Sequence, residues 1–130
     1  MEPGSPDGFA LPNDVLIVED DPIIALDFED TILGFGVMAV RTASSVARAL
    51  DMISERAPDF ALLDVSLIRE NSFAIAERLD ALKIPYIFVT GYGADASIPK
   101  AFSDKPRLPK PCSSEALRIA LRGLAGDPRR

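Results

Sequence analysis

The stretch Val15-Leu16-Ile17-Val18-Glu19-Asp20-Asp21 decides the fold of this chain. Four consecutive apolar residues are typical of a parallel strand that is buried on both faces, and the three acids mark the point where that strand ends. Three further stretches end in the same way: residues 60–63 precede Asp64, residues 86–89 precede Thr90, and residues 107–109 precede Lys110. Since open α/β sheets bind their ligands outside the carboxyl ends of the strands, we expect acids, a hydroxyl and an amine to meet at one edge. Carboxylates suit a divalent cation such as Mg²⁺, and threonine and lysine can hold phosphate oxygens.

Helical patterns separate these strands. Apolar spacing and capping residues predict helices over residues 22–33, from Ser44 or Ser45 to about residue 55, over residues 72–82, and from Ser113 or Ser114 to about residue 125. Strands are expected at residues 15–18, 37–40, 60–63, 86–89 and about 107–108, with a loop over residues 65–71. Five strands that alternate with helices predict an α/β fold with a doubly wound, five-stranded parallel sheet, most simply in the order 2-1-3-4-5.

Proline and glycine set the limits of the folded domain. Residues 1–13 are rich in both and are predicted to be a flexible leader. Residues 91–106 hold two glycines and two prolines, which leave room for about one or two helical turns, so the fourth helix should be weak or shortened. We therefore expect one folded domain over residues 14–125 and a tail over residues 126–130.

Composition narrows the classes of function. The net charge is −6 and the basic residues are scattered, so binding to nucleic acid or to an anionic membrane is not expected. Cys112 is the single cysteine and the N-terminus lacks the pattern of a signal peptide, which indicates a reducing, cytoplasmic setting. The chain has no histidine, which excludes Ser-His-Asp catalysis and a phosphohistidine on the chain itself. Any phosphohistidine must therefore belong to a partner protein.

Four motifs in order identify a resemblance. Val-Leu-Ile-Val-Glu19-Asp20-Asp21-Pro, Leu-Leu-Asp64-Val-Ser66-Leu, Phe-Val-Thr90-Gly-Tyr-Gly and Leu-Pro-Lys110-Pro resemble the motifs of the receiver domain of two-component response regulators, over about residues 15–124. The stretch Pro-Tyr-Ile-Phe-Val-Thr-Gly-Tyr-Gly at residues 85–93 is similar to the signature of the alphaproteobacterial FAT GUY receivers, with Val89 in place of the usual alanine. The resemblance implies a flavodoxin-like receiver fold, often free-standing or fused to the ends of hybrid kinases.

The resemblance also implies a role for each motif residue. Asp64 would be the phosphoacceptor, and Mg²⁺, for which Mn²⁺ can substitute, would be held by Asp20 and Asp64, by Glu19 through water and by the backbone carbonyl of Ser66. Thr90 would bind a phosphoryl oxygen. Lys110 would pair with the acids before phosphorylation and with the phosphoryl group afterwards, aimed inward by a cis bond to Pro111.

Two positions depart from the usual receiver pattern. Many receivers carry a switch aromatic three residues before the lysine, where this chain has Arg107, so any aromatic switch must use another residue, with Tyr92 the nearest candidate. Cys112 stands where an aromatic is common, and we interpret it as a packed thiol rather than a redox sensor.

The resulting hypothesis is a single-domain response regulator. It would take a phosphoryl group from a partner histidine kinase or histidine phosphotransfer protein onto Asp64, and signal by binding an unknown downstream protein. It would catalyse its own phosphotransfer, could catalyse its own dephosphorylation, and would not otherwise be an enzyme. One alternative is a phosphate sink or phosphorelay shuttle without a dedicated target. A phosphatase of the haloacid dehalogenase type fits less well, because that family places two acids as Asp-x-Asp and this chain has Asp64-Val65-Ser66.

Overall fold

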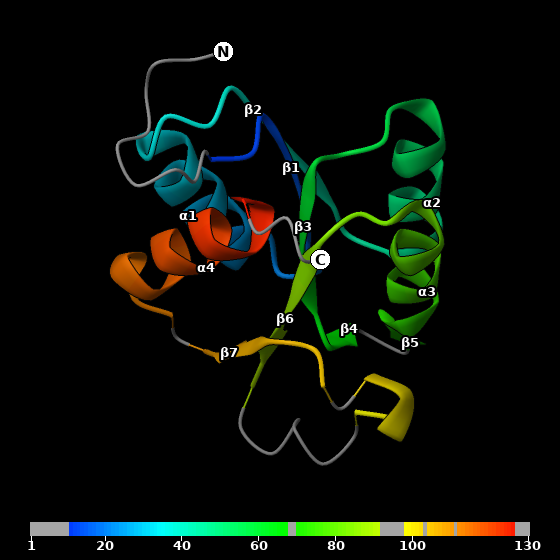
Figure 1. Cartoon of the computed structure of the whole chain (residues 1–130). Helices are drawn as coiled ribbons and strands as arrows, with labels where there is room; N and C mark the ends of the chain where they lie inside the picture. Colours follow the sequence, from blue (N-terminus) through cyan, green and yellow to red (C-terminus); the bar gives the residue numbers. More distant parts are fainter. Residues whose placement is uncertain (1–10, 68–69, 92–97, 103, 111, 127–130) are drawn as a thin grey trace.

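Five parallel strands form the centre of the molecule (Figure 1). The computed structural model describes residues 11–67, 70–91, 98–102, 104–110 and 112–126. The sheet has the order β2-β1-β3-β6-β7, in which neighbouring strands pair in parallel. Counted along the five-stranded sheet this is the order 2-1-3-4-5, so the predicted α/β fold is confirmed. The strands are β1 (Asp14–Val18), β2 (Ala39–Ala43), β3 (Phe60–Asp64), β6 (Tyr86–Thr90) and β7 (Arg107–Pro109).

Helices cover both faces of the sheet. Figure 1 shows α1 (Pro22–Gly34) and α4 (Ser114–Gly126) on one face, and α2 (Val46–Glu55) and α3 (Phe73–Leu82) on the other. Alternate residues of each central strand enter the two cores: Val15 and Ile17 pack toward the first pair of helices, and Leu16 and Val18 toward the second. Full burial of one such side chain contributes about 1.5–3 kcal/mol, so the apolar strands and the helix faces packed on them stabilise the fold together.

Short polar side chains cap the N-termini of α1 and α2 at positions that the sequence predicts. The Asp21 carboxylate accepts hydrogen bonds from the amides of Ile23 and Ile24, and Ser45 Oγ accepts one from the amide of Arg48. Helix α1 ends at Gly34, and Gly36 follows with a φ of +104°, a conformation that glycine adopts without strain. Because α1 starts directly after the acids of β1, its first turn lies at the edge where the ligands were expected.

The predicted position of the second strand is wrong by two to three residues. β2 covers Ala39–Ala43 instead of residues 37–40, since its register is set by pairing with β1. Arg41 lies inside this strand, which the sequence alone disfavours. Its guanidinium donates to the Asp14 carboxylate at 3.0 Å and to the carbonyl oxygens of Met52 and Arg56. These acceptors satisfy the hydrogen-bond donors of the Arg41 guanidinium, so the strand can contain this charged residue.

The loops that follow β3 and β6 contain short regular elements. The predicted loop over residues 65–71 holds an antiparallel pair, β4 (Ser66–Leu67) with β5 (Glu70–Asn71). Between β6 and β7, the described residues contain one 3-10 turn, η2 (Lys100–Phe102), in keeping with the predicted weak fourth helix. Residues 92–97, and residues 1–10 and 127–130 of the predicted leader and tail, lie outside the described residues. No helix in the described part of the chain is long and apolar enough to cross a membrane.

Candidate functional site

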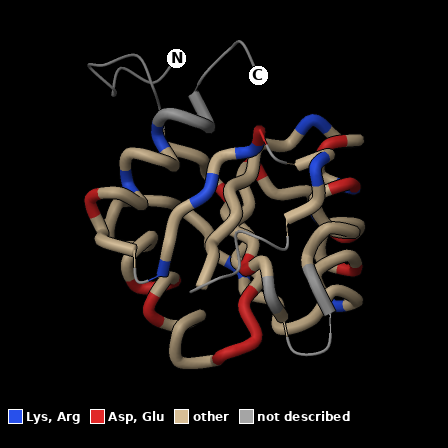
Figure 2. Tube along the Cα trace, turned by 90° about the horizontal axis from the view of Figure 1, so that it is seen from below, with Lys and Arg blue, Asp and Glu red and all other residues tan. Residues whose placement is uncertain are grey.

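Three carboxylates meet at the carboxyl edge of the sheet, which Figure 2 shows from below. Glu19 and Asp20 follow β1 directly, and Asp64 is the last residue of β3. β1 and β3 are neighbours, with Val18 opposite Leu63, so the residues that follow each of them lie side by side. One carboxylate oxygen of each acid lies within 4.8 Å of those of the other two. The predicted convergence of these three acids is therefore present in the structure.

Lys110 reaches this acid cluster from the far edge of the sheet. Its Nζ lies 2.9 Å from Glu19 Oε1 and 3.2 Å from Asp64 Oδ2. The backbone amide of Lys110 donates to the carbonyl oxygen of Thr90 at 2.8 Å, which fixes the start of this side chain beside the end of β6. The ammonium thus forms ion pairs with two buried carboxylates. Pro111, and with it the predicted cis bond, lies outside the described residues.

Thr90 and Ser66 complete the predicted set. Thr90 is buried at the end of β6, next to β3 in the sheet, and its hydroxyl donates to the carbonyl oxygen of Leu108 at 3.5 Å. This is a long hydrogen bond, so the hydroxyl can exchange it for a better acceptor at little cost. Ser66 begins β4 two residues after Asp64, and the amide of Val65 between them donates to the carbonyl oxygen of Val89. The structure therefore gathers all the predicted site residues at one edge.

Burial and like charge raise the pKa of Glu19 to about 7 from an ordinary value near 4.5. Burial is the largest cause, and Asp64 adds to it, whereas Lys110 and the amide of Asp21 act in the opposite direction. Burial alone would lower the pKa of Lys110, but Glu19 and Asp64 raise it above its usual value. Lys110 is thus held protonated while the cluster carries more negative charge than one ammonium can compensate.

The donor set fits a hard divalent cation. Carboxylate oxygens are the ligands that Mg²⁺ takes in proteins, usually one or two of them with water in the remaining positions. Glu19 Oε1 is buried and accepts no hydrogen bond of good geometry within the described residues, although Lys110 lies beside it. This oxygen can therefore accept a hydrogen bond from a metal-bound water.

Cys112 lies beside Lys110, and Arg107 lies in β7, three residues before that lysine. Burial raises the pKa of the Cys112 thiol, an effect that Lys110 partly offsets, and the thiol donates to the carbonyl oxygen of Pro109 at 3.1 Å. A raised pKa fits the packed thiol that the sequence analysis favoured. Arg107 is half-buried in β7. Tyr92, the predicted reporter aromatic, lies outside the described residues.

Sequence analysis missed two features around the site. An aromatic cluster joins Phe73 of α3, Phe88 of β6 and Phe102 of η2, with ring centroids 5.5–6.0 Å apart. A cleft between α1 and the end of β2 adjoins the acids and is lined partly by Glu29 and Thr42. Phe73, Phe102, Glu29 and Thr42 belong to none of the four motifs, and only the packing of the elements brings them beside the motif residues.

The fold and this set of residues are those of a receiver module of two-component signalling. The chain belongs to the response regulator receiver domain family, whose pattern matches residues 15–122. Receiver domains bind Mg²⁺ at an acid cluster of this kind and are signalling proteins rather than classical enzymes. The resemblance that the motifs predicted is therefore confirmed.

Individual relatives place the chain more narrowly within the family. In structure it is similar to SdrG from Sphingomonas melonis Fr1, with 39% identity and a TM-score of 0.75 over 84% of this chain and 92% of that one. In sequence it is 33% identical over 82 residues to the phyllosphere-induced regulator PhyR of Methylorubrum extorquens, and 34% identical over 86 residues to the polar-differentiation regulator DivK of Brucella anthropi. These matches cover 61% and 63% of this chain, and 31% of PhyR and 69% of DivK. The PhyR relatives support the FAT GUY-like grouping.

Proposed function

We propose that this chain accepts a phosphoryl group on Asp64 from a phosphohistidine of a partner protein. The partner is a histidine kinase or a histidine phosphotransfer protein, and the exchange takes place in the cytoplasm. The observation that carries the proposal is the position of the Lys110 ammonium, 3.2 Å from Asp64 within a cluster of three acids. An isolated surface aspartate would have neither the cation nor the two neighbouring carboxylates.

The reaction is a displacement at phosphorus. An Asp64 oxygen forms a bond to phosphorus, the bond from phosphorus to the imidazole nitrogen breaks, and the leaving imidazole takes up a proton from water. Most of the catalysis of such a transfer is positioning and stabilisation of charge. After transfer, Lys110 would form an ion pair with an oxygen of the phosphoryl group on Asp64. The Thr90 hydroxyl would donate a hydrogen bond to another of these oxygens.

Mg²⁺ would be held by Asp20, Asp64 and the carbonyl of Ser66, with Glu19 acting through water. When bound, it would neutralise charge on the transferring phosphoryl oxygens. The acids would in turn orient the ion beside Asp64 and keep this position selective for a small, hard cation. The phosphorylated protein would then signal through contacts with a downstream protein.

Labelling by a small donor tests the proposal. Incubation with acetyl phosphate and Mg²⁺ should add one phosphoryl group to the intact protein, and Asp64→Asn should remove the mass gain while the circular dichroism spectrum stays native. Asp30→Asn, which neutralises an exposed acid of α1, is the matched control and should still be labelled. Labelling of the Asp64→Asn protein on another aspartate would overturn the assignment.

A further inference from the structure

The segment that follows Asp64 forms a second, small sheet. β4 pairs with β5 in antiparallel register, with Ser66 opposite Asn71 and Leu67 opposite Glu70. Figure 1 shows this pair between the end of β3 and the start of α3. An isolated pair of such short strands is at best marginally stable in water. The position of β4 must therefore be fixed by contacts with the rest of the domain.

Two buried side chains fix β4 against the core. Val65 is 1% exposed and Leu67 is 5% exposed, and both belong to the core that the sheet shares with α2 and α3. They are two residues apart in extended backbone, so their side chains lie on the same face. The Val65 amide also donates to the carbonyl oxygen of Val89 in β6 at 3.0 Å. The main sheet thus fixes Val65, whereas burial of its side chain and pairing with Glu70 fix Leu67.

The carbonyl of Ser66 belongs to the peptide unit that joins Ser66 to Leu67. A peptide unit is planar, so the direction of its carbonyl depends on the two flanking Cα atoms and on rotation about the line between them. The buried Leu67 side chain fixes the second of these Cα atoms, and the pairing of both residues with β5 restrains the rotation. The orientation of this carbonyl relative to Asp64 therefore depends on a side chain that belongs to the apolar core.

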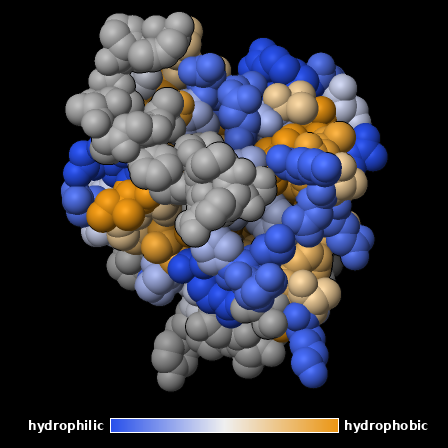
Figure 3. Space-filling model, in the orientation of Figure 1, coloured by the Kyte–Doolittle hydropathy of each residue, from blue (hydrophilic) through white to orange (hydrophobic). Residues whose placement is uncertain are grey.

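Leu67 contributes little to any contact surface. The exposed apolar side chains of α1 and α4 include Ile23, which is 78% exposed, and Ile119, which is 60% exposed. Figure 3 shows orange side chains that interrupt the hydrophilic surface on the side of α1 and α4. Leu67 is instead covered by the core beneath α2 and α3. A change of metal binding on replacement of Leu67 would therefore report the position of the backbone and not the loss of a contact with a partner.

We propose that Leu67 is a positioning residue for the metal site, because burial of its side chain holds the Ser66 carbonyl in place to bind Mg²⁺. The inference rests on the proposed function, since it concerns the ligands given there. Groups that orient a metal ligand typically change metal affinity by about 10- to 100-fold when they are mutated. A backbone carbonyl has no side-chain rotations with which to adjust, so it meets the ion only where the surrounding chain is fixed.

Mg²⁺ binding by Leu67→Ala, compared with Leu79→Ala, tests the inference. Leu79 is fully buried in the same core but lies near the end of α3, so both truncations leave a cavity there and should cause a comparable loss of stability in urea. In a titration followed by amide resonances, Leu67→Ala should raise the Kd for Mg²⁺ by about tenfold, and Leu79→Ala by less than about twofold. Leu67→Met conserves volume and should keep the Kd within about twofold of wild type. If the alanine variants do not fold, Leu67→Val and Leu79→Val give the same comparison, with an expected difference of about threefold.

Labelling by acetyl phosphate at increasing Mg²⁺ gives the second measurement. Leu67→Ala should need about tenfold more Mg²⁺ for its half-maximal rate, while its rate at saturating Mg²⁺ stays within about twofold of wild type. Equal Kd values for the Leu67 and Leu79 variants, or a Kd for Leu67→Met as high as that of Leu67→Ala, would overturn the inference and leave the proposed function intact. Failure of acetyl phosphate to label the wild-type chain would contradict the proposed function, and the inference would fall with it.

Discussion

Neutralisation of Asp64 should make the metal-free protein more stable. One carboxylate oxygen each of Glu19, Asp20 and Asp64 lies within 4.8 Å of those of the other two, and two ionised carboxylates at 4.8 Å repel by about 3.5 kcal/mol at an effective dielectric constant of about 20. At the same dielectric constant, the attraction between Asp64 and Lys110 at 3.2 Å contributes about 5 kcal/mol of stabilisation. At about pH 8, above the Glu19 pKa of about 7, all three acids are ionised, so Asp64→Asn removes these two repulsions and the attraction to Lys110, and we expect the free energy of unfolding to rise by about 2 kcal/mol.

Urea unfolding in EDTA, followed by circular dichroism, measures this change. In saturating Mg²⁺ the gain should shrink or reverse, since the wild-type cluster then holds a cation that the amide binds less well. Asp30→Asn is again the control, because it removes one charge from an exposed position and should shift stability by less than about 0.5 kcal/mol. If Asp64→Asn were no more stable than wild type in EDTA, the repulsion assigned to this cluster would be wrong.

Three further predictions concern the metal, the thiol and the aromatic cluster. Titration with Mg²⁺ should shift amide resonances near Asp20, Asp64 and Ser66 at millimolar concentration, because Mg²⁺ keeps several waters and binds few protein ligands; shifts confined to other regions would contradict the site. Cys112 is half-buried and burial raises its pKa, so iodoacetamide at pH 7.5 should modify it more slowly than a free thiol, with the difference lost in urea. Phe102→Ala removes a buried ring and should lower the free energy of unfolding by about 3 kcal/mol, whereas the exposed control Ile119→Ala should cost less than about 1 kcal/mol in the same urea assay.

The sequence predicts those parts of the fold that burial on both faces dictates. β1, β3 and β6 are continuous apolar runs, and no helical periodicity competes with them. β2 was misplaced because an edge strand is half-exposed and contains Arg41, whose acceptors on Asp14 and on α2 become visible only in three dimensions. The β4–β5 pair was missed because two-residue strands are too short to show alternation.

The site was predictable for the same reason that the strands were. Each motif residue ends or follows a strand, and parallel strands carry those positions to one edge. The pairing of Lys110 with both Glu19 and Asp64 could be predicted only through the family resemblance, because nothing in the local sequence fixes where a flexible ammonium ends. The cleft was not predictable, since the packing of α1 against β2 decides that Glu29 and Thr42 line the same hollow.

The aromatic cluster of Phe73, Phe88 and Phe102 lies next to the strand that contains Arg107. With arginine at the usual position of the switch aromatic, β7 brings no ring to this part of the sheet. Phe88 lies two residues before Thr90 on β6, so both side chains point to the same face, and the Phe88 ring meets Phe102 of η2 at 6.0 Å. Phe102 also stacks on Phe73 at 5.5 Å.

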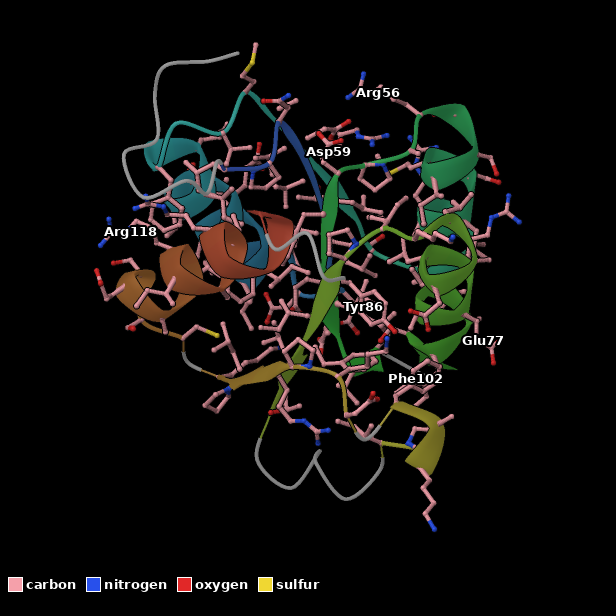
Figure 4. All side chains as sticks on the ribbon, viewed as in Figure 1. Arg56, Asp59, Glu77, Tyr86, Phe102 and Arg118 are labelled. Atoms are coloured by element: carbon pink, nitrogen blue, oxygen red, sulfur yellow. The ribbon has the colours of Figure 1, made fainter. Side chains whose placement is uncertain are left out.

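Lys105, in the segment between β6 and β7, also contacts the sheet and α3. The Tyr86 hydroxyl donates to the Asp80 carboxylate of α3, and Lys105 pairs with that carboxylate at 3.3 Å while lying over the Tyr86 ring. Figure 4 shows Tyr86 and Phe102 on the side of the sheet that carries α3. A movement of Thr90 toward Asp64 would therefore act on β6 at a point where Phe88 already contacts the segment between β6 and β7. In this chain Phe88, which belongs to the Phe-Val-Thr90 motif, and Phe102, which belongs to none of the four motifs, form the ring contact between the end of β6 and that segment.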